Sequence, residues 1–284
     1  SLYDMKLAGA IAYGDYKKPI IDSSILKIAL EYTKTFGGRV ISFCQDEFLS
    51  QNGVINESIV GTELGLKGIP YISESINIFR DIQILSYSGG KLHIPYVNTN
   101  KGVELIREAK KRNLDITAST SLAHVTFSDK DIANFNTNLK IIPPLRSEID
   151  SKSIKEALVD GTIDYLTSMH EPIDIDNKKV VFDLATPGSI GLESVFGIMC
   201  NNFTLEKTID ILTRNKSIFE IEDHPIKIGS HADLTLFNPD KSYKFSEEHI
   251  LSTSKNCAFI STKMKGIVYG SINNNNSTLN KLWI

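Results

Sequence analysis

Apolar residues along the chain recur with two alternating periods. Short β-branched and apolar runs predict buried strands at residues 8–15, 39–44, 90–97, 115–120 and 162–169. Helical spacing predicts helices at 23–37, 73–90, 100–113 and 153–161, the last capped by Ser151 or Ser153. Residues 138–147 are predicted to be a strand end and turn. This alternation favours a parallel sheet built from βαβ units.

The pattern changes after two more predicted helices. Residues 188–200 and 205–220 are predicted to be helical, and alternating patterns at 227–239 and 264–272 predict strands of a small β appendage. The four asparagines at 273–276 are a low-complexity tract that we expect to be a mobile loop. We therefore expect a barrel domain over residues 1–222 and a mostly β appendage over 223–284.

Composition limits which partners the protein can bind and in which cellular compartment it can reside. The 284 residues include 34 acidic and 31 basic side chains, a formal net charge of −3, so no global field favours nucleic acid or a membrane surface. The three cysteines are far apart, which fits a reducing cytosol, and Cys44 is expected to be a buried small residue rather than a nucleophile. With no signal peptide and no long apolar run, we expect a cytoplasmic protein.

One strand end raises a chemical question. Residues 164–172, "DYLTSMHEP", lead from a predicted buried strand into Met169 and His170 before Pro172 ends it. Strand tips of this kind carry the catalytic groups of barrel enzymes. A thioether therefore stands where a carboxylate is expected.

Several strings together resemble one family. "LKIIPPLRS" at 139–147 is similar to K-x-N-P-P-L-R-S, and "GSIGLES" at 188–194 is similar to G-I-x-G-L-E-T. "IGSHADLTLFNP" and "STSKNCAF…MKGIV" are similar to two later motifs in the same order. On these residues the chain resembles the dihydroorotase branch of the amidohydrolase superfamily over nearly its whole length.

The resemblance implies an α/β fold, a (β/α)8 TIM-like barrel of the metal-dependent hydrolase type with a small C-terminal β-sandwich. The chain starts near the third βα unit of that pattern, so the first strands and their H-x-H metal motif are missing from it. Such enzymes open and close the cyclic amide of dihydroorotate with one or two zinc ions, which activate water and polarise the carbonyl.

The first metal-ligand positions are altered in this chain. In "AYGDYKKP" the resemblance keeps Asp15 as a bridging carboxylate candidate but puts Tyr16 in place of the second acid. In "SFCQD" the metal histidine is Phe43, and in "LHIPYVNT" the next one is Tyr96. Two nitrogen donors have thus become aromatic rings.

The later positions are altered as well. Met169 replaces the aspartate that serves the family as metal ligand and general base, and Ile173 replaces a histidine that contacts substrate. Ile142 replaces the substrate-binding asparagine, whereas His170 and Gly188 remain. Because a neutral thioether cannot abstract a proton, we expect no intact catalytic residue and neither a metal nor another cofactor. Asp15, His170 and Gly188 are possible remnants of the site.

The histidines have plain structural alternatives. His93 is three positions before Tyr96 on a predicted strand, so we expect it on the opposite face, packed against the outer helices. His124 and His170 are expected to make local hydrogen bonds rather than to bind a metal. His224 and His231 are expected to be surface or turn residues.

Two functional hypotheses follow from the resemblance. The first is a dihydroorotase-like protein of pyrimidine biosynthesis without hydrolase activity, acting as a scaffold for an aspartate transcarbamoylase-like partner or as a homo-oligomer. The second is an active zinc-dependent cyclic amidohydrolase that uses Asp15 and ligands from a missing N-terminal region. A small-molecule sensor that uses the remodelled pocket is a third possibility.

Overall fold

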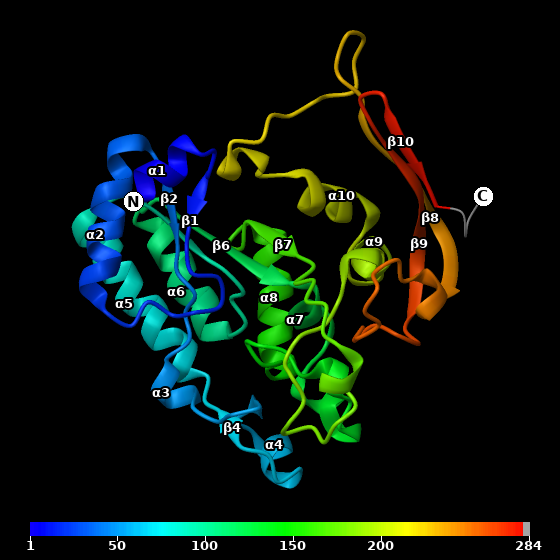
Figure 1. The fold of residues 1–284 in the computed structure, drawn as a ribbon, viewed down its shortest axis with the longest axis horizontal. Coiled ribbons are helices and arrows are strands. Elements are labelled where there is room, and N and C mark those ends of the chain that lie inside the picture. The colour runs from blue at the N-terminus through cyan, green and yellow to red at the C-terminus, as the bar shows by residue number, and fades with distance from the viewer. Residues whose placement is uncertain (281–284) are drawn as a thin grey trace.

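A curved parallel sheet forms the centre of the molecule in the computed structural model, which describes residues 1–280 (Figure 1). Its strand order is β1-β2-β5-β6-β7, and every neighbouring pair is parallel. The strands are β1 (Ala12–Tyr13), β2 (Arg39–Ile41), β5 (Lys91–Ile94), β6 (Ile116–Ser121) and β7 (Tyr165–Thr167). The predicted βα alternation is confirmed, although β1 is shorter than residues 8–15.

Helices cover one face of this sheet in chain order. The covering helices are α2 (Ser23–Thr33), α5 (Ile72–Ser88), α6 (Asn100–Lys111) and α8 (Glu148–Asp160), each packed against the next. The remaining helices are α1 (Leu2–Leu7), α3 (Glu47–Ser50), α4 (Ile59–Glu63), α7 (Leu122–Thr126), α9 (Val195–Asn202) and α10 (Leu205–Thr213). No helix within residues 1–280 has the length and apolar character needed to cross a membrane.

The core lies between the sheet and these helices. Leu92 and Ile94 of β5 are completely buried, as are Val103 and Ile106 on the apolar side of α6. Each such side chain contributes about 1.5–3 kcal/mol through burial. Helical spacing in the sequence therefore located the covering helices because it reports which side chains face the sheet.

Helix α8 begins earlier than its apolar pattern predicts. Its N-cap is Ser147, whose hydroxyl accepts from the backbone N–H of Asp150 while the Asp150 carboxylate accepts from the Ser147 backbone. Ser151 and Ser153 lie inside the helix, so their prediction as caps was wrong. The reciprocal capping box extends the helix one turn beyond its apolar residues.

Three other segments differ from their predicted structure. Residues 138–147 contain no strand and follow a 3₁₀ turn that ends at Leu139. Residues 188–194 form isolated bridges at Ser189 and Ile190 and a 3₁₀ turn before α9 begins at Val195. The asparagine tract is a tight hairpin turn, because β9 ends at Asn273 and β10 begins at Asn276. Asn274 adopts the left-handed backbone (φ 51°) that asparagine tolerates better than most residues.

The C-terminal appendage is one antiparallel sheet in the part of the chain that the structure describes. Its order is β10-β9-β8, with β8 (Asp233–Lys244), β9 (Lys263–Asn273) and β10 (Asn276–Leu279). Helix α9 packs closely against β9, where a Cβ on Gly197 would come within 2.9 Å of the Met264 Cβ atom. A further pair of short parallel strands, β3 (Ile55–Asn56) and β4 (Gly68–Ile69), flanks α4.

Candidate functional site at the carboxyl ends of the strands

An ion pair joins the loops that follow the two edge strands of the sheet. Lys17, after β1, places its Nζ 2.7 Å from the carboxylate of Glu171, after β7, and both side chains are about 15% exposed (14% and 15%). Tyr16 donates its hydroxyl to the same carboxylate at 2.5 Å. These contacts span 154 and 155 residues of sequence. The parallel strands thus present their carboxyl ends to one shared mouth.

Aromatic rings surround the ammonium of this pair. The Lys17 Nζ lies 5.4 Å from the centre of the Tyr96 ring and 5.8 Å from that of Tyr16. Cation–π attraction of this kind is worth about 0.5–2 kcal/mol, more as water is excluded. Tyr16 and Tyr96, which replace an acid and a histidine of the family motif, therefore hold a side-chain cation between them.

Burial sets the electrostatics of these groups. Tyr16 is 59% exposed overall, but desolvation of its hydroxyl and the hydrogen bond to Glu171 both raise its pKa, so this phenol stays protonated. Burial also raises the pKa of Tyr96 and lowers that of Lys17, while the Glu171 charge opposes the change at Lys17. The cluster therefore holds its protons on the phenols and offers no free base.

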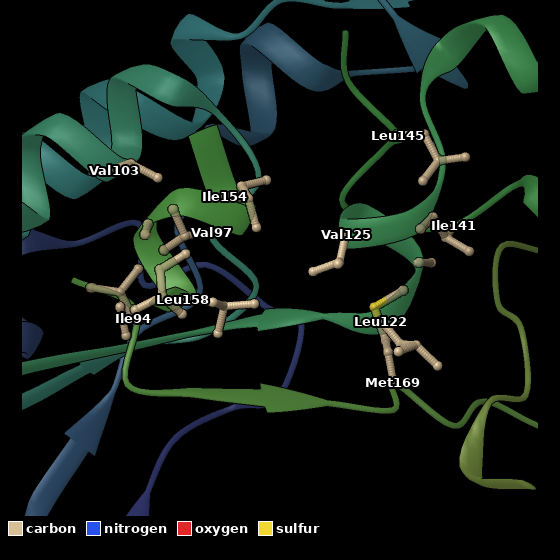
Figure 2. Close-up of a cluster of buried hydrophobic side chains, with 14 of the residues drawn as sticks. Ile94, Val97, Val103, Leu122, Val125, Ile141, Leu145, Ile154, Leu158 and Met169 are labelled. Atoms are coloured by element: carbon tan, nitrogen blue, oxygen red, sulfur yellow. The ribbon is translucent and has the colours of Figure 1, made fainter. Parts of the chain in front are cut away.

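Met169 belongs to the hydrophobic core. It is 4% exposed and lies in the same buried cluster as Leu122 and Ile141. Figure 2 shows its side chain beside Leu122. Its backbone is left-handed (φ 47°). A thioether at this position fills apolar volume, which a flexible unbranched side chain does well.

Phe43 and Cys44, after β2, are buried at 3% and 4% exposure. The Cys44 thiol lies 3.4 Å from the Asp81 carboxylate, which also accepts from Ser42 at 2.6 Å and pairs with Arg80. Burial raises the pKa of Cys44 well above its ordinary value, and the Asp81 charge adds to this. The expected burial of Cys44 is confirmed, and this thiol is a poor nucleophile.

The structure does not bring the possible remnants together around one point. Asp15 is exposed and lines a groove outside the sheet, beside α2, while Tyr16 takes the inner position. The His170 Nδ1 accepts from the backbone N–H groups of Gly191 and Leu192, each at 3.3 Å. Gly188, with φ 141°, lies against Glu171, where a Cβ would come within 3.1 Å of the Glu171 Cβ.

The other altered positions, Ile142 and Ile173, are half-buried. Ile173 lies beside Gly188, its side chain 3.0 Å from where a Cβ on that glycine would be, and its backbone N–H donates to Asn256. Ile142 is half-buried and precedes Pro143 through a cis peptide bond.

Near the ion pair, the concave side of the sheet forms an open cavity of about 340 Å³. It is lined by inward residues of all five strands and the loops after them, including His93, Tyr96, Ser119 and Tyr165. The expectation that His93 and Tyr96 lie on opposite faces was wrong. Strand β5 ends at Ile94, Pro95 follows, and Tyr96 is left-handed (φ 58°), so the two-residue alternation stops before Tyr96.

Hydroxyl groups saturate His93 at the cavity floor. Its Nδ1 lies 2.9 Å from the Thr117 hydroxyl, and its Nε2 lies 3.0 Å from Ser119 and 2.8 Å from Tyr165. The Tyr165 ring stacks on the imidazole at 5.1 Å. Burial lowers the pKa of His93 to about 3, and the charges of Arg39 and Lys110 contribute, so the ring is neutral at pH 7.

The other histidines make local contacts. His124 is buried and bonds the Ser121 hydroxyl at 2.7 Å and the Pro143 carbonyl at 3.0 Å, as expected. His224 and His231 are outside the sheet and contact one another, with ring centres 5.9 Å apart. Within residues 1–280 no three His, Cys, Asp or Glu side chains are grouped so that they could hold a metal ion. The described residues therefore do not fit a zinc centre.

Sequence reasoning missed Lys17, Glu171 and the inward direction of His93. A signal for the first two was present in the quoted strings. The family motif has glycine where this chain has Lys17 and alanine where it has Glu171, so opposite charges enter two separate motifs together. Their proximity depends on barrel curvature, which a single sequence does not contain.

Comparisons with known proteins identify relatives across most of the chain. It is 41% identical to a dihydroorotase of Endomicrobium trichonymphae, covering 92% of this chain and 64% of that protein. It is 37% identical to a dihydroorotase of Syntrophus aciditrophicus, covering 93% of this chain and 64% of the relative. The chain thus spans about two-thirds of the length of these relatives, slightly less in both cases. No protein-family model matches it.

Solved structures confirm the fold. The L-hydantoinase (dihydropyrimidinase) from Arthrobacter aurescens superposes with a TM-score of 0.84 at 19% identity, covering 99% of this chain and 67% of that one. A dihydropyrimidinase from Brevibacillus agri gives 0.80 at 17% identity, covering 97% and 65%. The α/β barrel of the amidohydrolase type with an antiparallel C-terminal appendage is therefore the fold of this protein.

One expectation is contradicted by these relatives. From the altered ligand positions we expected no cofactor, but the homologous dihydroorotases and hydantoinases are zinc-dependent. The expectation was wrong because it took the quoted positions of this chain as the whole ligand set.

Proposed function

This chain is a divergent homologue of the dihydroorotases, and from that premise we propose that it serves as a non-hydrolytic, dihydroorotase-like subunit of pyrimidine biosynthesis that binds a protein partner. The partner we propose is an aspartate transcarbamoylase-like enzyme. The three cysteines of this chain are unpaired thiols, which supports a place in the reducing cytosol.

The burial of Met169 is the observation that carries the proposal. Ring opening needs a group that takes a proton from water and returns it to the leaving nitrogen. Met169 stands at the position of that base, has no titratable atom and faces the core. Glu171, two residues further along the same loop, already accepts from Tyr16 and Lys17. Both of its oxygens are thus engaged, one by the Tyr16 phenol and one by the Lys17 ammonium.

A candidate partner surface lies on the outside of the sheet. The exposed apolar residues are Ile21, just before α2 (60% exposed), and three at helical spacing on α2, Ile25, Ile28 and Tyr32 (57%, 61% and 40% exposed). Together with α1 they line a largely apolar groove of about 740 Å³. Contiguous exposed apolar surface of this kind marks interaction sites in soluble proteins. This surface supports a role in which the protein acts as a scaffold that binds a protein partner.

The competing function is an active cyclic amidohydrolase that relies on Asp15. Asp15 is exposed in the α2 groove, and the inner position after β1 belongs to Tyr16. The geometry therefore favours the non-hydrolytic subunit over this alternative.

Two measurements on the same preparation test the proposal. The purified chain, preincubated with zinc, is assayed for ring opening of dihydroorotate against a hydrolase of known activity, and we expect no turnover above buffer. It is then mixed with the aspartate transcarbamoylase of the same organism, and we expect a stable complex by analytical ultracentrifugation. Measurable turnover would refute the non-hydrolytic part, and separate sedimentation of the two proteins would refute the partner.

A further inference from the structure

Three side chains at the mouth of the sheet surround one ammonium group. The Glu171 carboxylate and the rings of Tyr16 and Tyr96 make up this mouth cage. Within it, the Lys17 Nζ lies 2.7 Å from the carboxylate, 5.8 Å from the first ring centre and 5.4 Å from the second. Charge-assisted hydrogen bonds to carboxylates and contacts with ring faces within about 6 Å both favour a bound ammonium ion. The mouth cage is therefore a cation site whose occupant is a side chain of the same protein.

Both tyrosines of the mouth cage have strained backbones. Tyr16, after β1, has φ 51°, and Tyr96, after β5, has φ 58°, which is the left-handed region that residues other than glycine rarely adopt. Strain of this kind persists only where surrounding contacts hold it, and it is concentrated at ligand-binding sites and switches. Two separate strand ends thus adopt costly conformations, and both present a ring to the same cation. An ordinary surface ion pair needs no such strain.

A second lysine offers a comparison within the same chain. The Lys27 Nζ lies 3.1 Å from the Glu31 carboxylate and 5.9 Å from the centre of the Tyr87 ring. The charged side chains of that pair are 40% and 44% exposed, whereas those of Lys17 and Glu171 are 14% and 15% exposed. Water screens charges at exposed sites, so exposed ion pairs contribute little. The mouth cage therefore offers a cation a stronger electrostatic interaction than the same kinds of group do on α2.

Glu171 depends on Lys17 for its counter-charge. The Glu171 charge also acts on Lys178, but the Lys178 ammonium donates to the Thr137 and Thr186 carbonyls at 2.7 and 2.9 Å. Among residues 1–280, Glu171 forms its ion pair with Lys17 and with no other side chain. Truncation of Lys17 to alanine removes the side chain beyond Cβ, which has the atoms of an n-propylammonium ion. The carboxylate and the two rings would then surround a volume of that size and charge preference.

We propose that the mouth cage is a binding site for a primary alkylammonium ion, and that Lys17 occupies it as a tethered ligand. In the parent chain this occupant excludes other cations and holds the loop after β1 against the loop after β7. A free alkylammonium ion enters only where the Lys17 side chain has left the cage. This inference goes beyond the proposed function, because it needs neither an absence of hydrolysis nor a partner.

Chemical rescue tests the site. In the Lys17→Ala variant, n-propylammonium should bind in the mouth cage and stabilise the folded chain. We expect a Kd of about 10 mM, within the range open to so small a ligand, so 100 mM should raise the folding equilibrium constant about tenfold. Urea unfolding at pH 7 measures this in n-propylammonium chloride, and in 1-propanol with sodium chloride at the same concentrations. Stabilisation no greater with the amine than with the alcohol would overturn the proposal.

Two control variants locate the rescue. Lys27→Ala removes the ammonium of the exposed pair on α2 and should gain no more from n-propylammonium than from the alcohol with salt. Lys17→Ala combined with Glu171→Gln removes the carboxylate of the mouth cage, and we expect the amine to bind it at least tenfold more weakly. Equal rescue of all three variants would mean that the amine acts elsewhere, and the assignment would fail.

A second measurement covers an alanine variant that does not fold by itself. Lys17→Ala is then diluted from urea into each of the two solutions, and circular dichroism measures the folded fraction. We expect a larger folded fraction in n-propylammonium chloride than in 1-propanol with sodium chloride, and equal fractions would refute the site. The hydrolysis and partner measurements use the parent chain, so their failure and the failure of the rescue are distinguishable.

Discussion

Lys17 and Glu171 meet across the mouth of the sheet at 2.7 Å, although β1 and β7, the strands that precede them, are its two opposite edges. The ion pair therefore closes at loop level a sheet whose edge strands are not hydrogen-bonded to each other in the described residues. It lies where the family motifs have a glycine and an alanine, and it is held by two tyrosines at altered ligand positions.

Removing the carboxylate of this pair should destabilise the protein. Glu171→Gln leaves the ammonium of Lys17 partly buried and unpaired, and we expect the free energy of unfolding to fall by about 1–3 kcal/mol. Urea denaturation at pH 7 measures this. Glu31→Gln, which removes the exposed partner of Lys27, should change it by less than about 0.5 kcal/mol. A loss no greater at Glu171 than at Glu31 would show that the pair does not close the mouth.

Acid should unfold the protein through its buried histidines. The pKa of His93 is about 3 in the folded chain against an ordinary 6.5, so below pH 6.5 the unfolded chain binds a proton that the folded chain refuses. Stability is fully present above pH 6.5 and falls by about 1.4 kcal/mol for each unit below it, toward pH 3. His124, with a pKa lowered to about 4 by burial, adds to the slope.

The slope can be assigned by substitution. His93→Gln removes one titrating group, so its urea midpoint should change less between pH 7 and pH 5 than that of the parent. His231→Gln, on an exposed histidine, should keep the parental slope. Identical slopes for all three proteins would mean that His93 binds its proton as readily in the folded chain as in the unfolded chain, which contradicts a lowered pKa.

Met169 should tolerate apolar exchange and reject a charge. Met169→Leu preserves volume in the cluster with Leu122 and should cost less than about 1.5 kcal/mol. Met169→Asp puts a carboxylate among apolar side chains and should cost about 3 kcal/mol or more, or raise the pKa of the new group. Thermal unfolding of both variants is the measurement. An aspartate variant as stable as the leucine variant would place this side chain in water.

The stripe on α2 should govern association. Ile28→Glu adds a charge at a position that is 61% exposed, so the melting temperature should change little. Binding of the transcarbamoylase should weaken at least tenfold, since a charge in an apolar interface must be desolvated. Ile149→Glu makes the same change on α8, where the side chain is 74% exposed, and should bind normally. Unaltered binding by the Ile28 variant would move the interface elsewhere.

The alternation of strands and helices and the altered ligand positions were readable from the sequence, because apolar period and local motifs report on neighbouring residues. Ser147 was missed as the cap of α8 because a capping box needs no apolar residue. His93 was assigned to the outer face because the strand was assumed to continue, whereas Pro95 and the left-handed Tyr96 end the alternation.

The sequence by itself determined that this is a βα barrel in which Met169 cannot act as a base, since that property belongs to the side chain alone. Only the tertiary structure decided that Lys17 and Glu171, which are 154 residues apart, form an ion pair, and that His93 faces a cavity of hydroxyl groups. Both depend on sheet curvature and on contacts between distant strands, which arise from the packing of the whole chain and not from any local pattern.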